Sequence, residues 1–158
     1  MTMYTALATT TLGSAASTVT FGSIPQGYRD LMLVIAGRSA SSGNVVEMYF
    51  NGDTGANYSH VRMGGNGSNP FSTSKSDARV FNMTTNEGVS IIQIMDYSAT
   101  DKHKTSISTS SIAQDFVLAY AQRWASTSAV TSIELIFQTA INFAAGTTLS
   151  LYGIAGGS

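Results

Sequence analysis

The sequence predicts an all-β protein, an antiparallel two-sheet β-sandwich of jelly-roll type with about eight to nine strands. Short runs rich in β-branched and aromatic residues recur along the chain, separated by Gly, Asn, Asp and Ser turns. Heptads, solenoid periods and alternating strand and helix patterns are absent from the sequence. A chain of 158 residues is long enough to build one hydrophobic core without disulfides.

Residues 1–17 are rich in Thr and small side chains, and they predict an N-terminal arm or an edge strand. Residues 18–158 are expected to form a single sandwich domain, beginning with a half-buried strand at 18–21 where polar and apolar residues alternate. The N-terminus lacks the basic region and apolar core of a secretory signal. No apolar run approaches the roughly 20 residues of a membrane helix. We therefore expect the whole reading frame to be made in the host cytoplasm and to bind no membrane.

The central stretch of the chain predicts a β-hairpin. Residues 31–36 are an unbroken apolar run, which indicates a strand covered on both faces. A polar connector at 39–44 leads to a second strand-like run at 45–50. Asn51, Gly52 and Asp53 then supply the residues of a tight turn.

The middle of the chain gives a mixed signal. Residues 59–63 and 80–83 indicate short strands, and the segment 64–78 between them, from Gly64 to Ala78, has no periodicity. Loops of that length are usually functional or packed against a partner. Residues 89–97 are apolar on both faces and predict a strand inside a sheet. The polar, β-branched run 103–111 predicts a solvent-facing edge strand that pairs back on it.

Three further strands complete the series. Residues 116–125 place large side chains on one face and small ones on the other, with the period of two that is typical of a strand. Residues 130–137 and 149–152 show the same alternation. The strand spacing along the chain is that of an all-β sandwich.

Composition points to assembly. Hydrophobic residues make up 43% of the chain and charged residues only 11%, whereas about a quarter of a typical soluble domain is charged. A surface with so few charges is expected to be covered in part by other subunits. The net charge of −1 and the scattered Lys and Arg residues predict no nucleic-acid binding.

The residue types and spacings predict no metal site and no cofactor. The chain has no Cys, which excludes disulfides and thiolate ligands, and His60 and His103 are too far apart in sequence to share one strand face. The turn at Asn51 and Asp53 has the oxygen-rich appearance of a calcium loop but lacks the distal Glu of an EF-hand. Turn chemistry is favoured there, and weak ion binding stays open.

The sequence also predicts that the chain is not an enzyme. Asp101 and His103 would formally complete a triad with one of many serines, but no G-x-S-x-G turn is present and no nucleophile is placed beside a base. Four aromatic residues would suit sugar binding if exposed, but their spacing favours the core or a subunit interface. These residues are Tyr97, Tyr120, Trp124 and Tyr152.

Several segments together resemble a known family. They are residues 4–8 (YTALA), 12–14 (LGS), 19–31 (VTFGSIPQGYRDL), 50–53 (FNGD), 57–59 (NYS) and 146–154 (GTTLSLYGI). In these segments the chain resembles small virion structural proteins of tailed bacteriophages, often those of aquatic and cyanobacterial hosts. The resemblance covers both ends and most of the middle, and it does not extend to residues 64–78.

The resemblance implies a jelly-roll-like sandwich that assembles as a homotrimer on a phage particle. The first hypothesis is a capsid decoration or cement protein that binds the major capsid protein on the outer surface of the shell and stabilises the expanded shell by linkage. The alternative is a tail-fibre domain, or a receptor-binding or carbohydrate-binding domain of the virion, with the segment 64–78 as its contact loop.

Five residues are the candidate interface. Arg29, Asp30 and Arg38 flank the predicted central strand, and Tyr4 and Leu7 belong to the N-terminal arm. We expect them to contact a neighbouring subunit or the shell.

Overall fold

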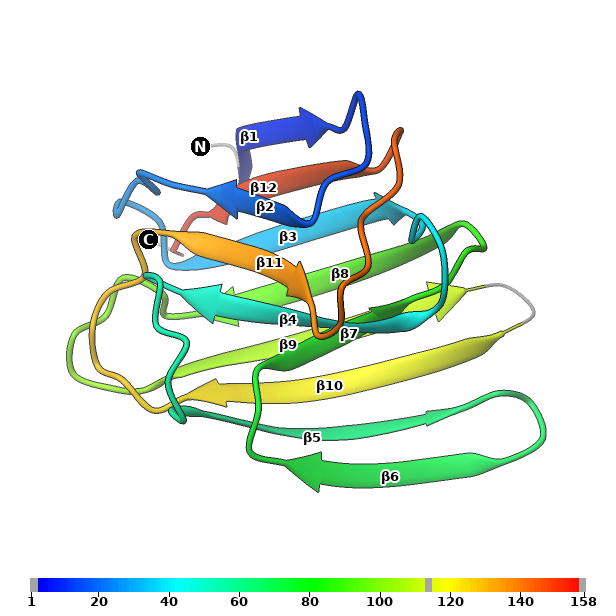
Figure 1. Ribbon diagram of the computed structural model, residues 1–158. Coiled ribbons are helices and arrows are strands. Elements are labelled where there is room, and N and C mark those ends of the chain that lie inside the picture. Colours follow the sequence, from blue (N-terminus) through cyan, green and yellow to red (C-terminus); the bar gives the residue numbers. More distant parts are fainter. Residues whose placement is uncertain (1–2, 113–114, 157–158) are drawn as a thin grey trace.

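In a computed structural model that describes residues 3–112 and 115–156, the chain is all-β, with twelve strands in two antiparallel sheets and no helix among those residues (Figure 1). The expected sandwich is present, but the expected count of eight to nine strands is too low. Because no described residue is helical, the described part of the chain contains no membrane-spanning helix.

The larger sheet has eight strands, in the order β1-β12-β3-β8-β9-β10-β5-β6. Their bounds are β1 Tyr4–Thr11, β12 Thr148–Ile154, β3 Asp30–Gly37, β8 Gly88–Met95, β9 Lys104–Ile112, β10 Phe116–Trp124, β5 Tyr58–Gly65 and β6 Pro70–Lys75. The segment that was expected to be an arm or an edge strand contains β1, which lies at one edge of this sheet and pairs with β12.

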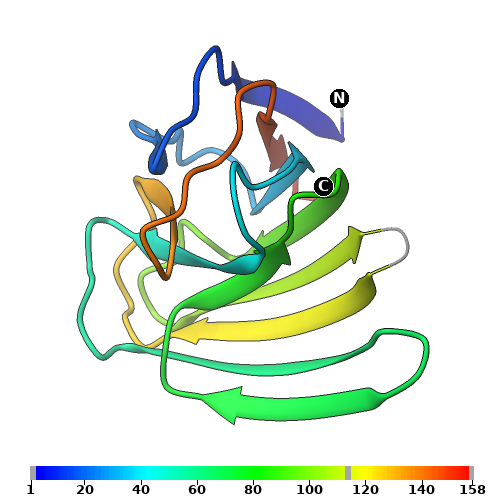
Figure 2. The same cartoon turned by 45° about the vertical axis from the view of Figure 1, so that its right-hand side comes forward.

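The smaller sheet has four strands, in the order β2-β11-β4-β7. Their bounds are β2 Thr18–Phe21, β11 Ile133–Phe137, β4 Asn44–Phe50 and β7 Arg79–Met83. This sheet lies across only part of the larger one, so that β5 and β6 extend beyond it (Figures 1 and 2).

The predicted hairpin of the central stretch is wrong. Both strands exist, as β3 and β4, but β3 lies in the larger sheet and β4 in the smaller one. The connector between them crosses from one sheet to the other, held by the Ser39 hydroxyl, which donates to the carbonyl of Ser42. A polar connector of this length fits both a hairpin and a crossing, and the sequence does not distinguish them.

Two other predictions about single segments are also wrong. The segment 64–78 is not a long loop, because it contains the end of β5 and the whole of β6. β6 is a polar edge strand with solvent on both sides and therefore has no apolar alternation. Strand β9 is not an edge strand, because it pairs with both β8 and β10 in the middle of the sheet.

The core fills the space between the sheets. Alternate residues of β3 and β8, including Leu33 and Ile92, point inward and are fully buried. They meet inward residues of the smaller sheet such as Met48 and Leu135. An aromatic cluster closes one end of the core, where Trp124 lies 5.5 Å from Phe50 between ring centroids.

Candidate functional site

The most distinctive surface of the molecule is the side of the larger sheet that faces away from the smaller sheet, called here the outer face. It is formed by the outward side chains of β3, β8, β9, β10 and β5. Six large apolar side chains on it are between 42% and 62% exposed, and they are Val61, Met63, Val89, Ile91, Ile107 and Val117. Contiguous exposed apolar surface of this kind usually marks an interaction site.

Strand register brings these side chains together. Ile107 of β9 pairs with Ala121 of β10, and Ala121 pairs with Val61 of β5. In the neighbouring row, Ala119 of β10 pairs with Met63. Paired residues on one face of a sheet lie about 5 Å apart, so these side chains of β9, β10 and β5 lie side by side, whereas Val89 and Ile91 of β8 are opposite Ser111 and Thr109 of β9.

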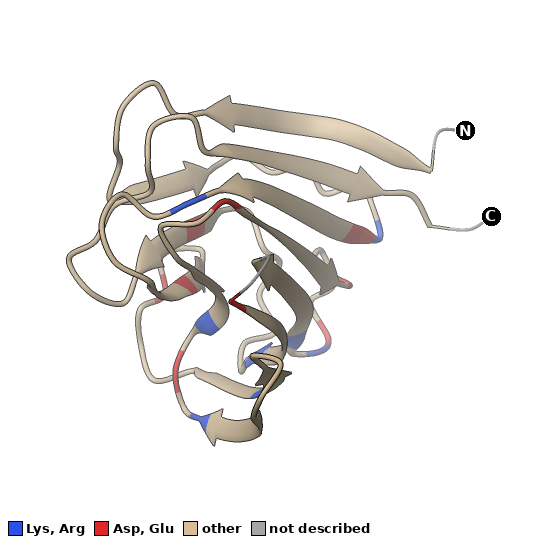
Figure 3. Ribbon diagram, turned by 90° about the vertical axis from the view of Figure 1, so that its right-hand side faces the viewer, with Lys and Arg blue, Asp and Glu red and all other residues tan. Residues whose placement is uncertain are grey.

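The outer face has almost no charge. Two charged residues, Arg123 of β10 and Asp30 of β3, stand at outward positions of these five described strands, both in the row at one end, and Asp30 is buried and paired with Arg29. Figure 3 shows the few charged residues as isolated segments of the ribbon. The surface is therefore apolar and nearly neutral rather than suited to a strongly charged ligand.

Two parts of the outer face can be named. Val89, Ile91 and Ile107 on β8 and β9 are large side chains that are 42–52% exposed, and we call them the ridge. Two shallow hollows, of about 560 and 730 Å³, lie beside it over β10, β5 and β6, and together we call them the trough. Small side chains make part of its lining, among them Ala121, Ser72, Ser74 and Gly65.

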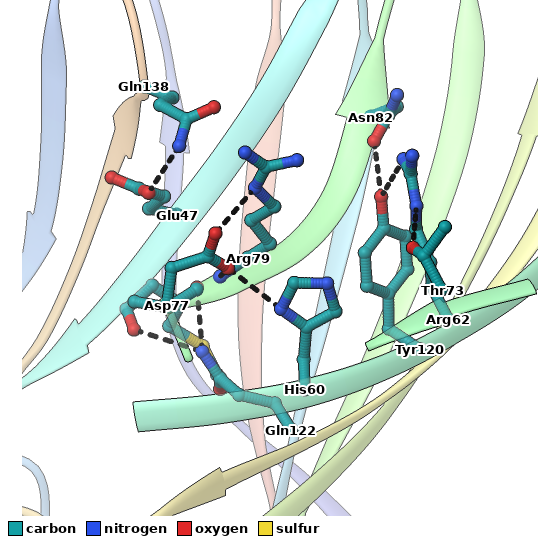
Figure 4. Close-up of polar contacts among 12 residues, drawn as sticks. Glu47, His60, Arg62, Thr73, Asp77, Arg79, Asn82, Tyr120, Gln122 and Gln138 are labelled. Atoms are coloured by element: carbon teal, nitrogen blue, oxygen red, sulfur yellow. Dashed lines mark hydrogen bonds and ion pairs between the residues drawn. The ribbon is translucent and has the colours of Figure 1, made fainter. Parts of the chain in front are cut away.

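A polar cluster lies between the sheets, near β5 and β7 (Figure 4). The His60 side chain is fully buried, and its Nδ1 lies 2.7 Å from Oδ1 of Asp77, whose Oδ2 lies 2.9 Å from Nε of Arg79. Burial lowers the pKa of His60 despite the opposing effect of Asp77. Because Asp77 lies in the connection from β6 to β7, the cluster fixes the point at which the chain crosses between the sheets.

Arg62 is held on the overhanging part of the larger sheet. Its Nε donates to Oγ1 of Thr73 at 3.0 Å, and its guanidinium carbon lies 5.3 Å from the centre of the Phe71 ring. The neighbouring Tyr120 hydroxyl donates to the side chain of Asn82 (Figure 4). Burial raises the pKa of Tyr120. The arrangement orients a cation beside a partly exposed aromatic ring.

Three of the five candidate interface residues lie at one end of the larger sheet. Tyr4 of β1 pairs with Ile154 of β12, which pairs with Asp30 of β3. Arg29 is half exposed and forms an ion pair of 2.8 Å with Asp30. Asp30 itself is buried, and it also accepts a hydrogen bond from the backbone of Asp96. Tyr4 and Arg29 are thus available to a partner, whereas Asp30 is a structural residue.

The other two candidates lie elsewhere. Arg38 follows the opposite end of β3, about 26 Å away for an eight-residue strand, and its Nε lies 3.2 Å from a carboxylate oxygen of Glu87. Leu7 packs against the core at a bulge in β1, so it is not a free contact residue. The five residues therefore do not form one site.

The Asn51 turn is confirmed as a tight turn, with Asn51 and Gly52 in the left-handed backbone region. Asn51 Oδ1 accepts hydrogen bonds from the backbone of Thr131 and Ser132. Asp53 accepts from Trp124 Nε1 at 2.7 Å, and this bond lowers the pKa of Asp53. These oxygens serve the fold, and the described residues contain no group of three or more His, Cys, Asp or Glu suited to a metal ion.

The aromatic residues weighed as a sugar platform are mostly in the core. Tyr97, Tyr120 and Trp124 are almost completely buried, and Tyr152 is half-buried. Sequence reasoning instead missed the outer face. Its signal was present in the runs 31–36 and 89–97, which are apolar on both faces, but the first was interpreted as a strand covered on both sides and the second only as a strand inside a sheet.

Comparison with known proteins assigns the chain to no family. No known protein family and no curated protein matches the chain. Among solved structures, the alginate lyase Aly36B is 12% identical, with a TM-score of 0.36 over 92% of this chain and 77% of the lyase. A mutant of that lyase in complex with an alginate tetrasaccharide is 11% identical, with a TM-score of 0.30 over 95% of this chain and 81% of the other.

A protein of unknown function from Shewanella oneidensis MR-1 is also similar, at 11% identity and a TM-score of 0.23, over 98% of this chain and 77% of the other. The prediction that the chain is not an enzyme is wrong by this comparison, because two of the three structures are of an alginate lyase. TM-scores below 0.5 are nevertheless too low to assign that activity to this chain.

Proposed function

We propose that the chain is a structural subunit of a bacteriophage virion, a capsid decoration or cement protein that binds the outer shell as a homotrimer. The observation that carries this proposal is the outer face, an apolar and nearly uncharged surface that is open to solvent in the single chain. A protein built to remain alone in solution would rarely leave such a surface bare. Jelly-roll connectivity and assembly in threes follow from the resemblance and belong to the same proposal.

The proposed mechanism is linkage. A subunit that binds the expanded shell, but not its precursor, stabilises the expanded state in proportion to its affinity and concentration. The shell partner is the major capsid protein. Tyr4 and Arg29 are exposed at one end of the sandwich, and Arg38 is exposed at the opposite end. These two ends are the candidate contacts with the shell.

Capsid binding tests this proposal. Purified capsids that lack the chain are incubated with increasing amounts of it and then sedimented, and saturation at a fixed number of copies per particle is expected. Arg29→Ala and Arg38→Ala each remove one half-exposed Arg beside opposite ends of β3, and a thermal melt checks the fold of Arg29→Ala, which leaves the buried Asp30 without its ion pair. Loss of binding in only one of them identifies the end that meets the shell. Absence of wild-type binding to expanded capsids would contradict the proposal.

A second candidate is a tail-fibre domain, or a receptor-binding or carbohydrate-binding domain of the virion. It is favoured by Phe71, whose side chain is 37% exposed with Arg62 stacked over the ring on the overhanging β5–β6 hairpin. An aromatic ring beside an oriented cation suits a sugar ring that carries an acidic group. Binding to cell-surface glycans that Phe71→Ala abolishes, without binding to capsids, would favour this candidate over the first.

A further inference from the structure

The outer face raises the question of what covers it, because the single chain leaves it bare. The sequence makes β3, β8 and β10 apolar on both sides, yet in the single chain only their inward sides are fully buried. Ile92 is fully buried while its neighbour Ile91 is 42% exposed. We infer that the outer face is the surface through which copies of this chain contact one another, with the ridge of one copy seated in the trough of the next.

Charge favours a second copy as the occupant. When a surface meets another copy of itself, each charged group brings a like charge into the same interface, which is unfavourable. The outward positions of β3, β8, β9, β10 and β5 hold two charged residues at the margin, Arg123 and the buried Asp30, which is neutralised by Arg29. A nearly neutral apolar face has no such repulsion to overcome, whereas it offers little to a partner that is recognised through charge.

Shape favours the same occupant. Val89, Ile91 and Ile107 of β8 and β9 are 42–52% exposed, and the hollows over β10, β5 and β6 lie beside them on the same face. The face therefore carries both exposed large apolar side chains and hollows lined in part by apolar residues. In a closed ring of three, each copy offers its ridge to one neighbour and its trough to the other, so that a single face serves both contacts.

The size of the face can be compared with known interfaces. Five strands from β3 to β5 at spacings of about 4.8 Å, each of about eight residues at about 3.3 Å, cover roughly 600 Å² in projection before side-chain relief is counted. A stable interface buries about 800 Å² on each partner, and each copy in a ring of three makes two contacts. The outer face therefore supplies a part of the area that a ring of three requires.

The inference rests on the proposed homotrimer, and light scattering coupled to size-exclusion chromatography tests it without capsids. Wild-type chain is expected at the mass of three 16.6-kDa subunits. Ile107→Lys places a charge on the ridge, and Ala121→Tyr fills the trough. Each is expected to reduce the mass to that of one chain. Both positions are exposed, so a cooperative thermal melt is expected to persist and to show that each variant still folds.

A matched control sharpens the test. Thr20→Lys adds the same charge at an exposed position of β2, on the smaller sheet, and should leave the trimer intact.

The opposite results are equally clear. A wild-type chain that is monomeric at all concentrations, or an Ile107→Lys chain with the mass of the wild-type trimer, would overturn the inference. A wild-type trimer that the two face variants dissociate, but that ignores expanded capsids, would support it and would instead contradict the proposed shell-binding function.

Discussion

Two adjacent isoleucines on β8 provide a matched pair for testing which face of the larger sheet is buried in the core and which is exposed. Ile92 points between the sheets and is fully buried, with Leu33 and Ser108 as its paired neighbours. Ile91 points outward and is 42% exposed. Replacing each by Ala removes the same atoms from the same strand, so the loss of β propensity, at most about 1 kcal/mol, is common to both variants.

The difference in burial should therefore give the two variants different free energies of unfolding. Ile92→Ala leaves a cavity in a close-packed core, and such substitutions cost about 2–5 kcal/mol in the free energy of unfolding. For a chain of this size each kcal/mol lowers Tm by about 2–4 °C, so a fall on the order of 10 °C is expected. Ile91→Ala should cost about 1 kcal/mol or less in the isolated chain.

Urea unfolding followed by the fluorescence of Trp124, which is buried against Phe50, gives the assay. If copies associate through the outer face, the cost of Ile91→Ala should rise with protein concentration, because association stabilises the folded state by mass action. The cost of Ile92→Ala in the free energy of unfolding, relative to wild type, should not change with protein concentration. Equal losses for the two variants at every concentration would refute the assignment of inner and outer faces.

Three further predictions concern single contacts. Burial lowers the pKa of His60, so the neutral imidazole stabilises the folded state fully above the unfolded pKa of about 6.5. This stabilisation is lost as the pH falls toward the lower pKa of the folded state. Tm should fall on acidification through this range and fall less in His60→Gln, and parallel pH profiles would contradict the buried neutral state. A Cβ at Gly153 would lie 2.5 Å from Cγ of Tyr28, so Gly153→Ala should cost about 1–3 kcal/mol. In a Tyr28→Ala background that cost should shrink, and simple additivity in denaturant titrations would argue against the clash. Asn51→Ala loses four side-chain hydrogen bonds and places Ala at φ +56°, at a cost of about 2–4 kcal/mol. Asn51→Gly should cost less because Gly tolerates that φ, and equal losses would show that the backbone conformation is not at issue.

The strands that the sequence predicts well are those with one apolar face. Val19 and Phe21, or Leu149 and Leu151, alternate with polar neighbours and are buried as the period of two requires. The tight turn at Asn51 is likewise encoded locally, by residues that accept a left-handed backbone. In these segments, local chemistry and tertiary structure agree.

The position of β9 depended on partners distant in sequence. Ser106, Ser108 and Ser110 look like the solvent side of an edge strand, yet all three are buried. Ser106 donates to Gln122 and Ser110 accepts from Ser90, so neighbouring strands satisfy these hydroxyl groups. A serine that is buried with a partner cannot be distinguished from a serine in water by its own sequence context.

The candidate site was predicted only in part. The low proportion of charged residues predicted a surface covered by other subunits but not its place in the fold, and the apolar run at 31–36 was interpreted as a strand covered on both faces. Which face the smaller sheet covers is decided by strand order, not by local pattern. Arg29 and Asp30 were predicted to contact a partner, but neighbouring residues of opposite charge can equally form an ion pair with each other, as these do.

A cryo-EM reconstruction of the virion that contains this chain tests the proposed function most directly. The expected result is density for the chain in trimers over the capsid lattice, with the outer faces of the three larger sheets turned toward a common axis. Density confined to the tail tip or fibres would contradict the decoration role, and trimers with their outer faces turned away from one another would contradict the proposed contact between copies.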